Sequence, residues 1–282
     1  MKICIIIPAH NEESFISDTV DSLINQSLTP SKLVLVDDNS SDSTGKIIDN
    51  YSKRHDWIES IHLISEDKHI PGSKVVNAFL KGFETTHEAY DIICKFDADL
   101  IFEPNYLKAI ANHFNNNPKL GMASGFCYIK TNNNWVLENV ANKSHIRGAL
   151  KAYRKACYKQ IGGLKTSIGW DTIDELLAQY YGWETLTDAN LKVKHLKITG
   201  KSYTKGSKKL QGEAMYKMRM HFTLTLITGL KIALLKKTPS ILFDYLVGYL
   251  EALFKNKAYL VDTNQGKFIR RLRWRGIFNK LF

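Results

Sequence analysis

The sequence predicts an α/β fold: a mostly parallel sheet with helices on both faces, followed by a helical C-terminal extension. Over roughly the first 200 residues, short apolar runs alternate with segments whose apolar residues recur at helical spacing. The runs are apolar throughout, which is typical of strands buried on both faces of a parallel sheet. Beyond this region the alternation stops, and two longer apolar segments follow.

The expected strands follow the apolar runs. Residues 2–8 (KICIIIP), 32–37 (KLVLVD) and 90–96 (YDIICKF) are the clearest of them. Shorter runs at 60–64 and 121–128 predict two further strands. Because a helical segment separates each strand from the next, the pattern favours an open sheet built from strand–helix–strand units.

The expected helices lie between these runs. Apolar residues recur at helical spacing within 14–25, and shorter helical segments occupy 43–51 and 74–83. A further helix is expected over 104–114. It begins with Pro104, and proline is favoured at the first helical position because the backbone N–H that it lacks has no partner there.

The composition is that of an ordinary globular protein. The chain has 282 residues, of which 44% are hydrophobic and 24% charged, so disorder, collagen and coiled coil are poor descriptions. Its four cysteines show no C-x-x-C spacing, which argues against a zinc site or a disulfide framework and favours buried thiols in a reducing compartment. The first residues run directly into a predicted strand, so no signal peptide is expected.

Charge is distributed unevenly along the chain. Residues 1–180 carry 19 Lys and Arg against 22 Asp and Glu, whereas residues 181–282 carry 20 against 6. A basic C-terminal part implies a polyanionic partner, either nucleic acid or an anionic membrane surface. The chemistry is therefore expected in the first 180 residues.

The basic part also contains apolar segments at 222–235 and 241–254. Both are interrupted by charge and fall short of the ~20 apolar residues that a transmembrane helix needs. They are either two packed helices of a small second domain or helices lying partly in a membrane interface. The tail, 266–282, holds six Lys and Arg and no acid among large apolar residues, and we expect it to dock on an anionic membrane. The alternative is a tail folded back on the acidic catalytic domain.

Acidic, turn-rich segments follow three of the predicted strands, at 8–13, 37–42 and 97–99. The carboxyl ends of parallel strands meet at one edge of a sheet, where ligands bind in such folds. Asp97 and Asp99 point the same way in an extended chain, so together they can hold Mg²⁺ or Mn²⁺ with positions left for phosphate oxygens. No G-x-G-x-x-G follows the first strand, which disfavours a dinucleotide fold.

Three motifs, IIIPAHNEE, LVDDNSSDST and KFDADLIFEPNYL, occur in this order and resemble family 2 of the inverting glycosyltransferases, which have the GT-A fold. The resemblance covers about residues 3–200 and continues through KVVN at 74–77, IGGL at 161–164 and GWDTIDEL at 169–176. It implies a domain over 1–200, with a nucleotide-sugar half (1–128) and an acceptor half (129–200). Similar bacterial members carry a basic, membrane-associated extension, as expected here for 201–282.

The resemblance also implies a nucleotide-diphosphate sugar donor, a divalent metal (Mg²⁺ or Mn²⁺) and site residues. The nucleotide pocket would be lined by Pro8, His10 and Glu12, and the base would be bound by Asp38 or Asp37. Lys74 would lie near the diphosphate. Asp97 would touch the ribose or a water next to the metal, and Asp99 would bind the metal itself. Many members have Tyr or Phe in place of His10. An imidazole can still stack on a base.

The catalytic base is expected at the start of a helix that ends at Gly182-Trp183. The usual family spacing places it at Asp171, preceded by Trp170 where the family has Glu. Asp174 and Glu175 lie one turn further on and remain alternatives; a helix cap is the alternative role of Asp171. His195, in the alternating strand 192–196, is expected to contact the metal or diphosphate, or else to be an ordinary strand histidine.

The predicted reaction is metal-dependent transfer of a sugar, with inversion, to a hydroxyl of a glycan or glycolipid in cell-surface polysaccharide or glycolipid assembly. We expect the protein in the cytoplasm, peripheral on the inner membrane. One alternative is a polyprenyl-phosphate sugar synthase with the same donor site. The other is a non-enzymatic, basic nucleic-acid-binding protein. Because the basic residues border apolar segments, a membrane surface is favoured over nucleic acid as the partner.

Overall fold

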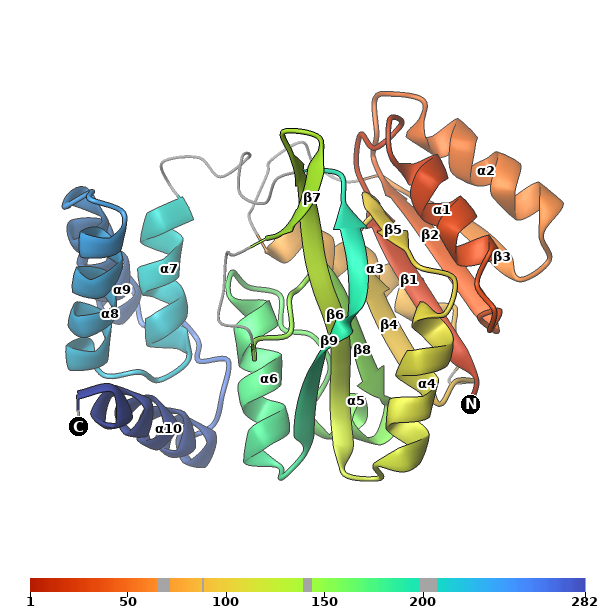
Figure 1. Ribbon diagram of the computed structural model, residues 1–282. Helices are drawn as coiled ribbons and strands as arrows, with labels where there is room; N and C mark the ends of the chain where they lie inside the picture. The colour runs from red at the N-terminus through yellow and green to blue at the C-terminus, as the bar shows by residue number, and fades with distance from the viewer. Residues whose placement is uncertain (65–71, 88, 139–143, 198–206, 282) are drawn as a thin grey trace.

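The computed structural model describes residues 1–64, 72–87, 89–138, 144–197 and 207–281 (Figure 1). In this part of the chain nine strands form one sheet. The strands are β1 (Ile3–Ala9), β2 (Lys32–Asp38), β3 (Ile58–Leu63), β4 (Ile92–Phe96), β5 (Leu100–Phe102), β6 (Leu120–Thr131), β7 (Asn134–Leu137), β8 (Leu150–Arg154) and β9 (Glu184–His195).

Helices cover both faces of this sheet and continue beyond it at the C-terminal end (Figure 1). They are α1 (Ile16–Ile24), α2 (Thr44–Arg54), α3 (Ser73–Glu84), α4 (Tyr106–Asn116), α5 (Lys155–Gln160), α6 (Trp170–Tyr180), α7 (Ser207–Lys217), α8 (Phe222–Leu235), α9 (Ser240–Phe254) and α10 (Thr263–Leu281). The predicted α/β class with a helical C-terminal extension is therefore confirmed.

The first half of the sheet is parallel, in the order β3-β2-β1-β4. Every residue of β1 and of β4 is buried, as their continuous apolar runs predict. Successive side chains of β1 enter opposite faces: Cys4 and Ile6 belong to one core cluster, and Ile3 and Ile5 belong to the other. The carboxyl ends of β1, β2 and β4 therefore meet at one edge.

The second half of the sheet is mixed. Strand β8 lies antiparallel between β4 and β6, β9 runs parallel to β6, and β5 pairs antiparallel with β9. Sequence patterning predicted β6 and the end of β9 but neither β5, β7 nor β8. The sequence of β8 is LKAYR, in which Lys151 and Arg154 break the apolar run, and β5 has only three residues.

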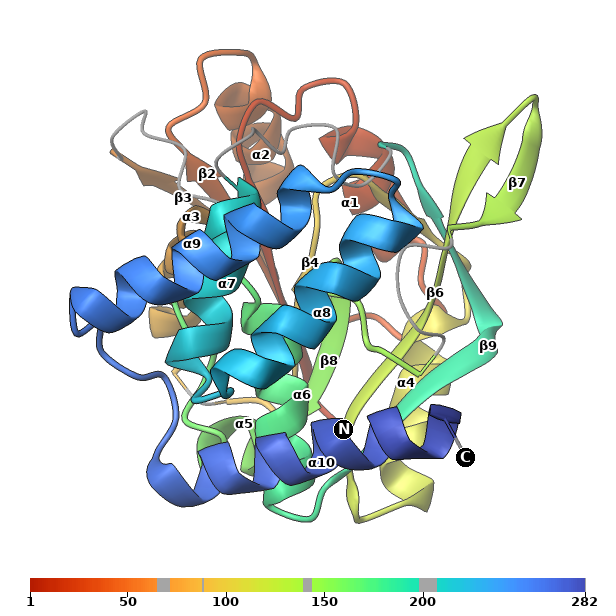
Figure 2. The same ribbon diagram turned by 90° about the vertical axis from the view of Figure 1, so that its left-hand side faces the viewer.

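The C-terminal helices pack beside α6, away from the sheet, and α8 and α9 lie over α7 (Figures 1 and 2). No described helix is long and apolar enough to cross a membrane. Helix α10 takes up the predicted tail and rests on α6, with Ile269 fully buried and Phe268 against Tyr180 at 5.5 Å between ring centroids. The tail is thus folded back on the catalytic domain. The predicted boundary at residue 200 lies outside the described residues.

The four cysteines are buried and free, as expected for reduced thiols.

Candidate active site

The carboxyl ends of β1 and β2 are joined by a network of short polar contacts. The His10 Nδ1 lies 2.7 Å from the backbone oxygen of Asp38, and the Glu12 backbone N–H donates to Thr44 Oγ1 at 2.7 Å. His10 is exposed above this edge, whereas Pro8 is buried within β1. The imidazole is therefore placed where a flat base can stack on it from solvent.

Of the two carboxylates that end β2, Asp38 is the one beside a lysine from another element. Its Oδ2 lies 3.9 Å from Lys74 Nζ, in the first turn of α3. Asp37 instead accepts from the Ser40 backbone N–H at 3.1 Å and contacts His62 at 3.1 Å. Because Asp37 holds its own turn, Asp38 is the better placed of the two to bind a ligand together with Lys74.

Glu12 connects the end of β1 to the residues after β9. Its carboxylate pairs with Lys197, two residues beyond the end of β9. Burial raises the pKa of Glu12 to about 7; the Lys197 ammonium opposes this shift, and the nearby negative charges of Asp99 and Asp97 add to it. The acidic strand ends are thus close enough to influence one another.

Asp99 and His195 meet at the same edge. Strand β5 pairs with β9 so that Leu100 lies opposite His195, and the Leu196 backbone N–H donates to the Asp99 carbonyl at 2.9 Å. This register brings His195 Nε2 to 3.3 Å from Asp99 Oδ2, with both side chains buried. The two residues expected to hold a metal are therefore neighbours in space although they are far apart in sequence.

A second carboxylate supports His195 from behind. The His195 Nδ1 lies 2.8 Å from Glu138 Oε2, and Glu138 also pairs with Arg147. Burial disfavours the charged imidazolium, but the carboxylates of Asp99 and Glu138 outweigh burial and raise the pKa of His195 to about 9. At this pKa the imidazole is protonated at neutral pH, with Nδ1–H toward Glu138 and Nε2–H toward Asp99. A metal ion would displace the Nε2 proton, and the contact with Glu138 would then orient the ring as carboxylates orient metal-binding histidines.

These side chains fit a hard divalent cation. Asp99 and His195 offer an oxygen and a nitrogen donor that face each other. The carboxylate suits both Mg²⁺ and Mn²⁺, whereas the imidazole suits Mn²⁺ better than Mg²⁺, which takes oxygen ligands; either ion leaves positions for phosphate oxygens. Cys127, Glu138 and His195 also form a group with potential ligand atoms within 4.8 Å of one another. Burial raises the pKa of the Cys127 thiol to about 12, so it stays neutral and is a poor ligand for a hard cation.

Asp97 is linked to the acceptor side by a buried lysine. Lys95 pairs with Asp97, donates to the Gly148 carbonyl at 3.1 Å and lies 5.4 Å from the Trp170 ring centroid. A Cβ atom on Gly148 would come within 3.2 Å of the Asp171 Cβ. The start of α6 is therefore in contact with the end of β4.

Asp171 is the accessible carboxylate of α6. Gly169 adopts a left-handed conformation (φ 77°), and the turn buries Trp170 while the Asp171 side chain stays 37% exposed. Burial alone would raise the pKa of Asp171, but the His145 imidazole, 3.7 Å away, and the Lys151 ammonium outweigh it and hold the pKa below its usual value. Asp171 is thus a carboxylate at neutral pH, as a general base must be.

The other two acidic residues of α6 are occupied by protein partners. Asp174 is fully buried, with its oxygens 2.7 and 2.8 Å from Lys151 Nζ, and it also accepts from the Tyr153 hydroxyl. Glu175 lies 2.8 Å from His145 Nδ1 and accepts the Ile146 backbone N–H. Asp174 therefore anchors α6 to β8, and Asp171 is the most exposed carboxylate of the three.

Replacing His145 with Asn should remove part of the pH dependence of stability. Burial lowers the pKa of His145, but Asp171 and Glu175 outweigh it and raise the pKa from 6.5 to about 9. A raised histidine pKa stabilises the fold below about pH 6.5, and this contribution is lost as the pH rises to about 9; it is worth about 3 kcal/mol. Urea unfolding at pH 6.5 and pH 9 should show a smaller difference for His145→Asn than for the wild type. His55→Asn is the control and should keep the wild-type difference in unfolding free energy between the two pH values. If His145→Asn also keeps this difference, the raised pKa of His145 is wrong.

Sequence reasoning missed the cations that pair with the carboxylates of the site, and it missed the carboxylate behind His195. These residues are Lys95, Lys151, His145, Arg147, Lys197 and Glu138. One signal was present: a lysine inside an apolar strand, as in IICKF, is buried only when it is paired.

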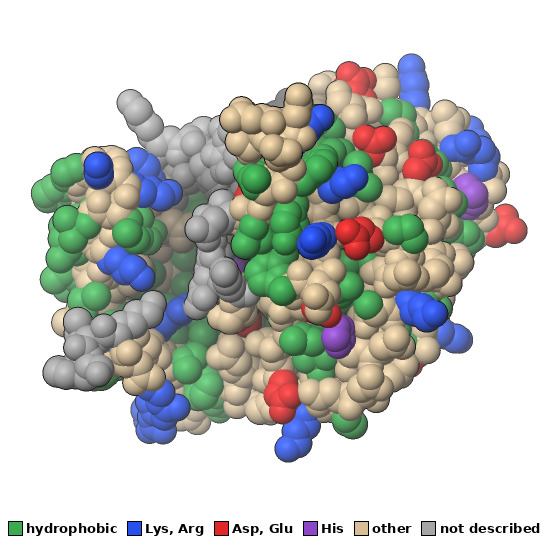
Figure 3. Space-filling model, in the orientation of Figure 1, with side chains coloured by type: hydrophobic (Ala, Val, Ile, Leu, Met, Phe, Trp, Pro, Cys, Tyr) green, Lys and Arg blue, Asp and Glu red, His purple; other side chains and the backbone are tan. Residues whose placement is uncertain are grey.

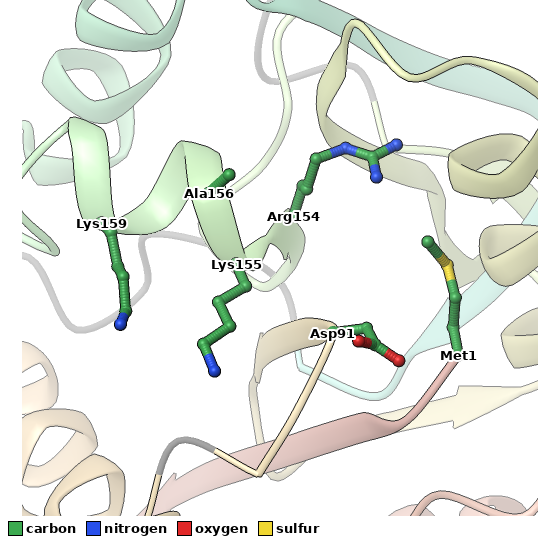
Figure 4. A pocket seen from close by; sticks show the side chains of 6 residues that line it. All are labelled: Met1, Asp91, Arg154, Lys155, Ala156 and Lys159. Carbon is green, nitrogen blue, oxygen red and sulfur yellow. The ribbon is translucent and has the colours of Figure 1, made fainter.

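A cavity of about 390 Å³ lies elsewhere, lined by Met1, Asp91, Arg154, Lys155, Ala156 and Lys159 (Figure 4). Met1 and Asp91 precede β1 and β4, so this cavity is at the amino ends of the parallel strands. Ligands in such sheets bind at the carboxyl ends. The Arg154 guanidinium also donates to three backbone carbonyls there. The cavity is therefore separate from the candidate site.

Two curated proteins show the sequence relationship. The probable glycosyltransferase YdaM of Bacillus subtilis is 35% identical over 100 residues, which cover 35% of this chain and 23% of that protein. The poly-beta-1,6-N-acetyl-D-glucosamine synthase of Staphylococcus epidermidis is 26% identical over 165 residues, or 58% of this chain and 35% of that protein. The chain thus matches only a minor part of each relative's own length.

Two solved structures show the fold. S. aureus TarS 1–349 in complex with UDP-GlcNAc superposes with a TM-score of 0.58 at 17% identity, covering 96% of this chain and 81% of that one. The mannosyltransferase PcManGT from Pyrobaculum calidifontis, in complex with GDP-Man and Mn²⁺, gives 0.57 at 15% identity, covering 100% and 81%. These similarities confirm the expected GT-A type of fold.

A family match completes the comparison. Residues 4–166, which include β1 to β8 and the three acidic strand ends, match the glycosyl transferase family 2. The alternative of a non-enzymatic, nucleic-acid-binding protein is therefore not supported. This chain belongs to glycosyl transferase family 2.

Proposed function

We propose that the protein is an inverting, metal-dependent glycosyltransferase. It moves a sugar from a nucleotide-diphosphate donor to a hydroxyl of a glycan or glycolipid in cell-surface polysaccharide assembly. One observation carries the proposal: the pair Asp99–His195, the carboxylate Asp38 beside Lys74, and the accessible Asp171 all lie at one edge of the sheet. The TarS complex with UDP-GlcNAc and the PcManGT complex with GDP-Man and Mn²⁺ support a donor of this kind.

On the donor side, each residue has a role that suits its surroundings. His10 stacks on the base, and Asp38 accepts hydrogen bonds from it at the end of β2. Lys74 faces the diphosphate from the start of α3, and Asp97 binds the ribose or a water next to the metal. Asp99 and His195 hold the divalent cation, which offsets the negative charge that develops on the leaving diphosphate.

On the acceptor side, Asp171 removes the proton. The acceptor hydroxyl attacks C1 of the sugar as its proton passes to the Asp171 carboxylate, and the bond from C1 to the diphosphate oxygen breaks. The nucleoside diphosphate leaves with the electron pair, so one displacement inverts the anomeric carbon. His145 holds the carboxylate in its charged form before the reaction.

In this proposal residues 1–128 form the donor half and residues 129–200 form the acceptor half, which also contributes His195 to the metal. The basic region 201–282 associates with the cytoplasmic face of the inner membrane. Exposed apolar side chains of α8 and α9, among them Leu234 and Phe254, favour a lipid environment.

The same observation supports a second candidate, a polyprenyl-phosphate sugar synthase. Its acceptor is a lipid phosphate, which is already ionised near neutral pH and needs little help from a base. This candidate predicts a single-sugar lipid as product and a small effect of Asp171→Asn. If the acceptor is instead a hydroxyl, Asp171→Asn should lower the rate strongly.

Donor binding tests the proposal directly. Nucleotide-diphosphate sugars with different bases and sugars are added with Mn²⁺, with Mg²⁺ or with chelator, and the melting temperature is measured. A specific donor at 100 times its Kd should stabilise the protein by about 2.7 kcal/mol, which corresponds to a rise of several degrees. The rise should need the metal and should shrink in Asp38→Asn. If no donor stabilises the protein under any metal condition, the proposed function is wrong.

A further inference from the structure

The two helices α8 and α9 present large apolar side chains to solvent. On α8 the exposed residues include Leu226, Ile227, Leu230, Leu234 and Leu235, and on α9 they include Phe243, Val247, Leu253 and Phe254. Leu234, Leu235 and Phe254 are 70%, 72% and 79% exposed. We call these nine residues the α8–α9 face. In Figure 2 both helices lie toward the viewer, in front of α7, and Figure 3 shows hydrophobic side chains along the edge formed by α8.

We propose that the α8–α9 face rests in the headgroup region of an anionic lipid bilayer. The docking element is then this helical hairpin, not the tail 266–282 that the sequence suggested. Large apolar side chains that gather on an exposed face often mark an interaction surface. Its chemistry identifies the partner.

The hairpin is apolar on its outward side as well as on its protein-facing side. The protein-facing side of the two helices buries Leu224 and Ile241 together with small residues such as Gly229, whereas Leu230 and Leu234 point outward. On α9 the backbone approaches so closely that a Cβ on Gly248 would lie 1.9 Å from the Lys209 carbonyl oxygen. Close contacts at small residues, with apolar residues on both sides of the helix, are expected where the outward side also meets an apolar environment.

The hairpin is too short to span a bilayer. Helices of 14 and 15 residues are about 21–23 Å long, less than the ~30 Å hydrocarbon core. They therefore lie along the surface with one side buried in the boundary between headgroups and acyl chains.

Charge around the face selects an anionic surface. Exposed lysines border it: Lys231 on α8, Lys236 and Lys237 in the turn between the helices, and Lys255 and Lys257 after α9. The acidic residues from 222 to 257 are Asp244 and Glu251, and Glu251 pairs with Lys209. A second copy of the chain would bring the same lysines against each other in a two-fold interface. A bilayer with acidic lipids neutralises them.

The tail is less suited to this role. The first half of helix α10 directs apolar residues to the protein interior: Ile269 is fully buried, and Phe268 packs against Tyr180, whereas Phe278 near its end is 53% exposed. Arg270 donates to the Arg219 carbonyl at 2.6 Å. The exposed cations of α10, such as Arg271 and Arg275, can add long-range attraction without inserting apolar groups.

The proposal rests on the membrane association included in the proposed function, and vesicle flotation tests it with the full chain and without sugar transfer. A failure of flotation is therefore distinguishable from a failure of donor binding. Wild-type protein should float with phosphatidylcholine vesicles that contain phosphatidylglycerol, less so at high salt, and little with phosphatidylcholine alone. The double variant Leu234→Asp/Leu235→Asp should lose binding by at least about tenfold. Lys236→Gln/Lys237→Gln should weaken binding to anionic vesicles by about tenfold. Since these side chains are exposed, melting temperatures should stay near that of the wild type.

Two matched controls sharpen the result. Val136→Asp places the same charge at another exposed apolar residue, on β7, and should leave binding unchanged. Arg271→Gln/Arg275→Gln removes two exposed cations from α10 and should keep most of the binding. Failure of the wild type to bind anionic vesicles overturns the proposal. So does loss of binding only in the α10 variant, or a dimer that Leu234→Asp/Leu235→Asp dissociates in the absence of lipid binding.

Discussion

Asp99→Asn is expected to lower sugar transfer by about 10³-fold or more at limiting metal while leaving the fold intact. The amide keeps the shape of the side chain but loses the charge that holds the cation. A divalent metal contributes several kcal/mol of charge stabilisation in the transition state, and 1.36 kcal/mol is a factor of ten in rate. His195 keeps its contact with Glu138 in this variant, which preserves the local packing.

The measurement is initial rate against Mn²⁺ and Mg²⁺ concentration, together with the melting temperature in chelator. Asp18→Asn, on the exposed side of α1, is the matched control and should behave as the wild type. Glu138→Gln should have a smaller effect than Asp99→Asn. It keeps the metal ligands Asp99 and His195 but weakens the hydrogen bond that orients the His195 ring, so metal affinity should fall by about 10–100-fold. Near-wild-type turnover of Asp99→Asn at limiting metal would show that Asp99 is not a metal ligand.

Strands β1, β2 and β4 of the parallel half were predictable because they are buried on both faces. KICIIIP and KLVLVD carry the pattern in the residues themselves, and β1 and β2 follow these runs closely. Strand β8 is as deeply buried, but it contains Lys151, whose charge is compensated by Asp174 on α6. From the sequence alone, each member of a buried ion pair is expected at the surface, because its partner is distant along the chain. Local pattern therefore missed β8, and the antiparallel pairs beyond β4 with it.

The site was predictable in its donor half for a similar reason. The acidic strand ends lie at one edge in any parallel sheet, and the motifs there resemble a known family. The contact of His195 with Asp99, by contrast, depends on the register of β9 against β5, a strand of three residues. Glu138 lies outside the motifs altogether. Its contact with His195 depends on the tertiary structure and cannot be predicted from the local sequence.

The amino-acid composition of the C-terminal region did not predict which of its residues face the protein. The cations and aromatic residues of 266–282 predicted membrane docking, but the structure turns Phe268 and Ile269 toward the protein. In contrast, the sequence left 222–254 as either packed helices or interfacial ones. The structure shows two packed helices, with Leu224 and Ile241 buried and with Leu230 and Leu234 exposed to solvent.

Sequence alone also left three carboxylates as candidates for the base. Asp171, Asp174 and Glu175 lie on one side of a helix start, so spacing does not separate them. The partners of these residues on other elements distinguish them. Lys151 of β8 forms an ion pair with Asp174, whereas His145 pairs with Glu175 and lies 3.7 Å from Asp171.

Asp171→Asn is therefore expected to lower kcat by about 10²–10⁴-fold, the usual contribution of general acid–base catalysis. Donor Kd should change little, because Asp171 belongs to the acceptor side. The melting temperature should also stay close to that of the wild type, because the side chain is partly exposed and its loss leaves His145 paired with Glu175.

Asp174→Asn and Glu175→Gln separate the chemical role from the structural one. Breaking the buried pair of Asp174 with Lys151 should destabilise the protein by about 3–5 kcal/mol. Activity per folded molecule, measured well below the melting temperature, should fall less than in Asp171→Asn. Glu175→Gln keeps the hydrogen-bonding shape beside His145 and should be milder still. If Asp171→Asn retains its rate while either other variant loses it without loss of stability, the proton acceptor is that residue. If all three retain their rates, the acceptor is ionised before attack, as a lipid phosphate is, and the hydroxyl-acceptor mechanism is wrong.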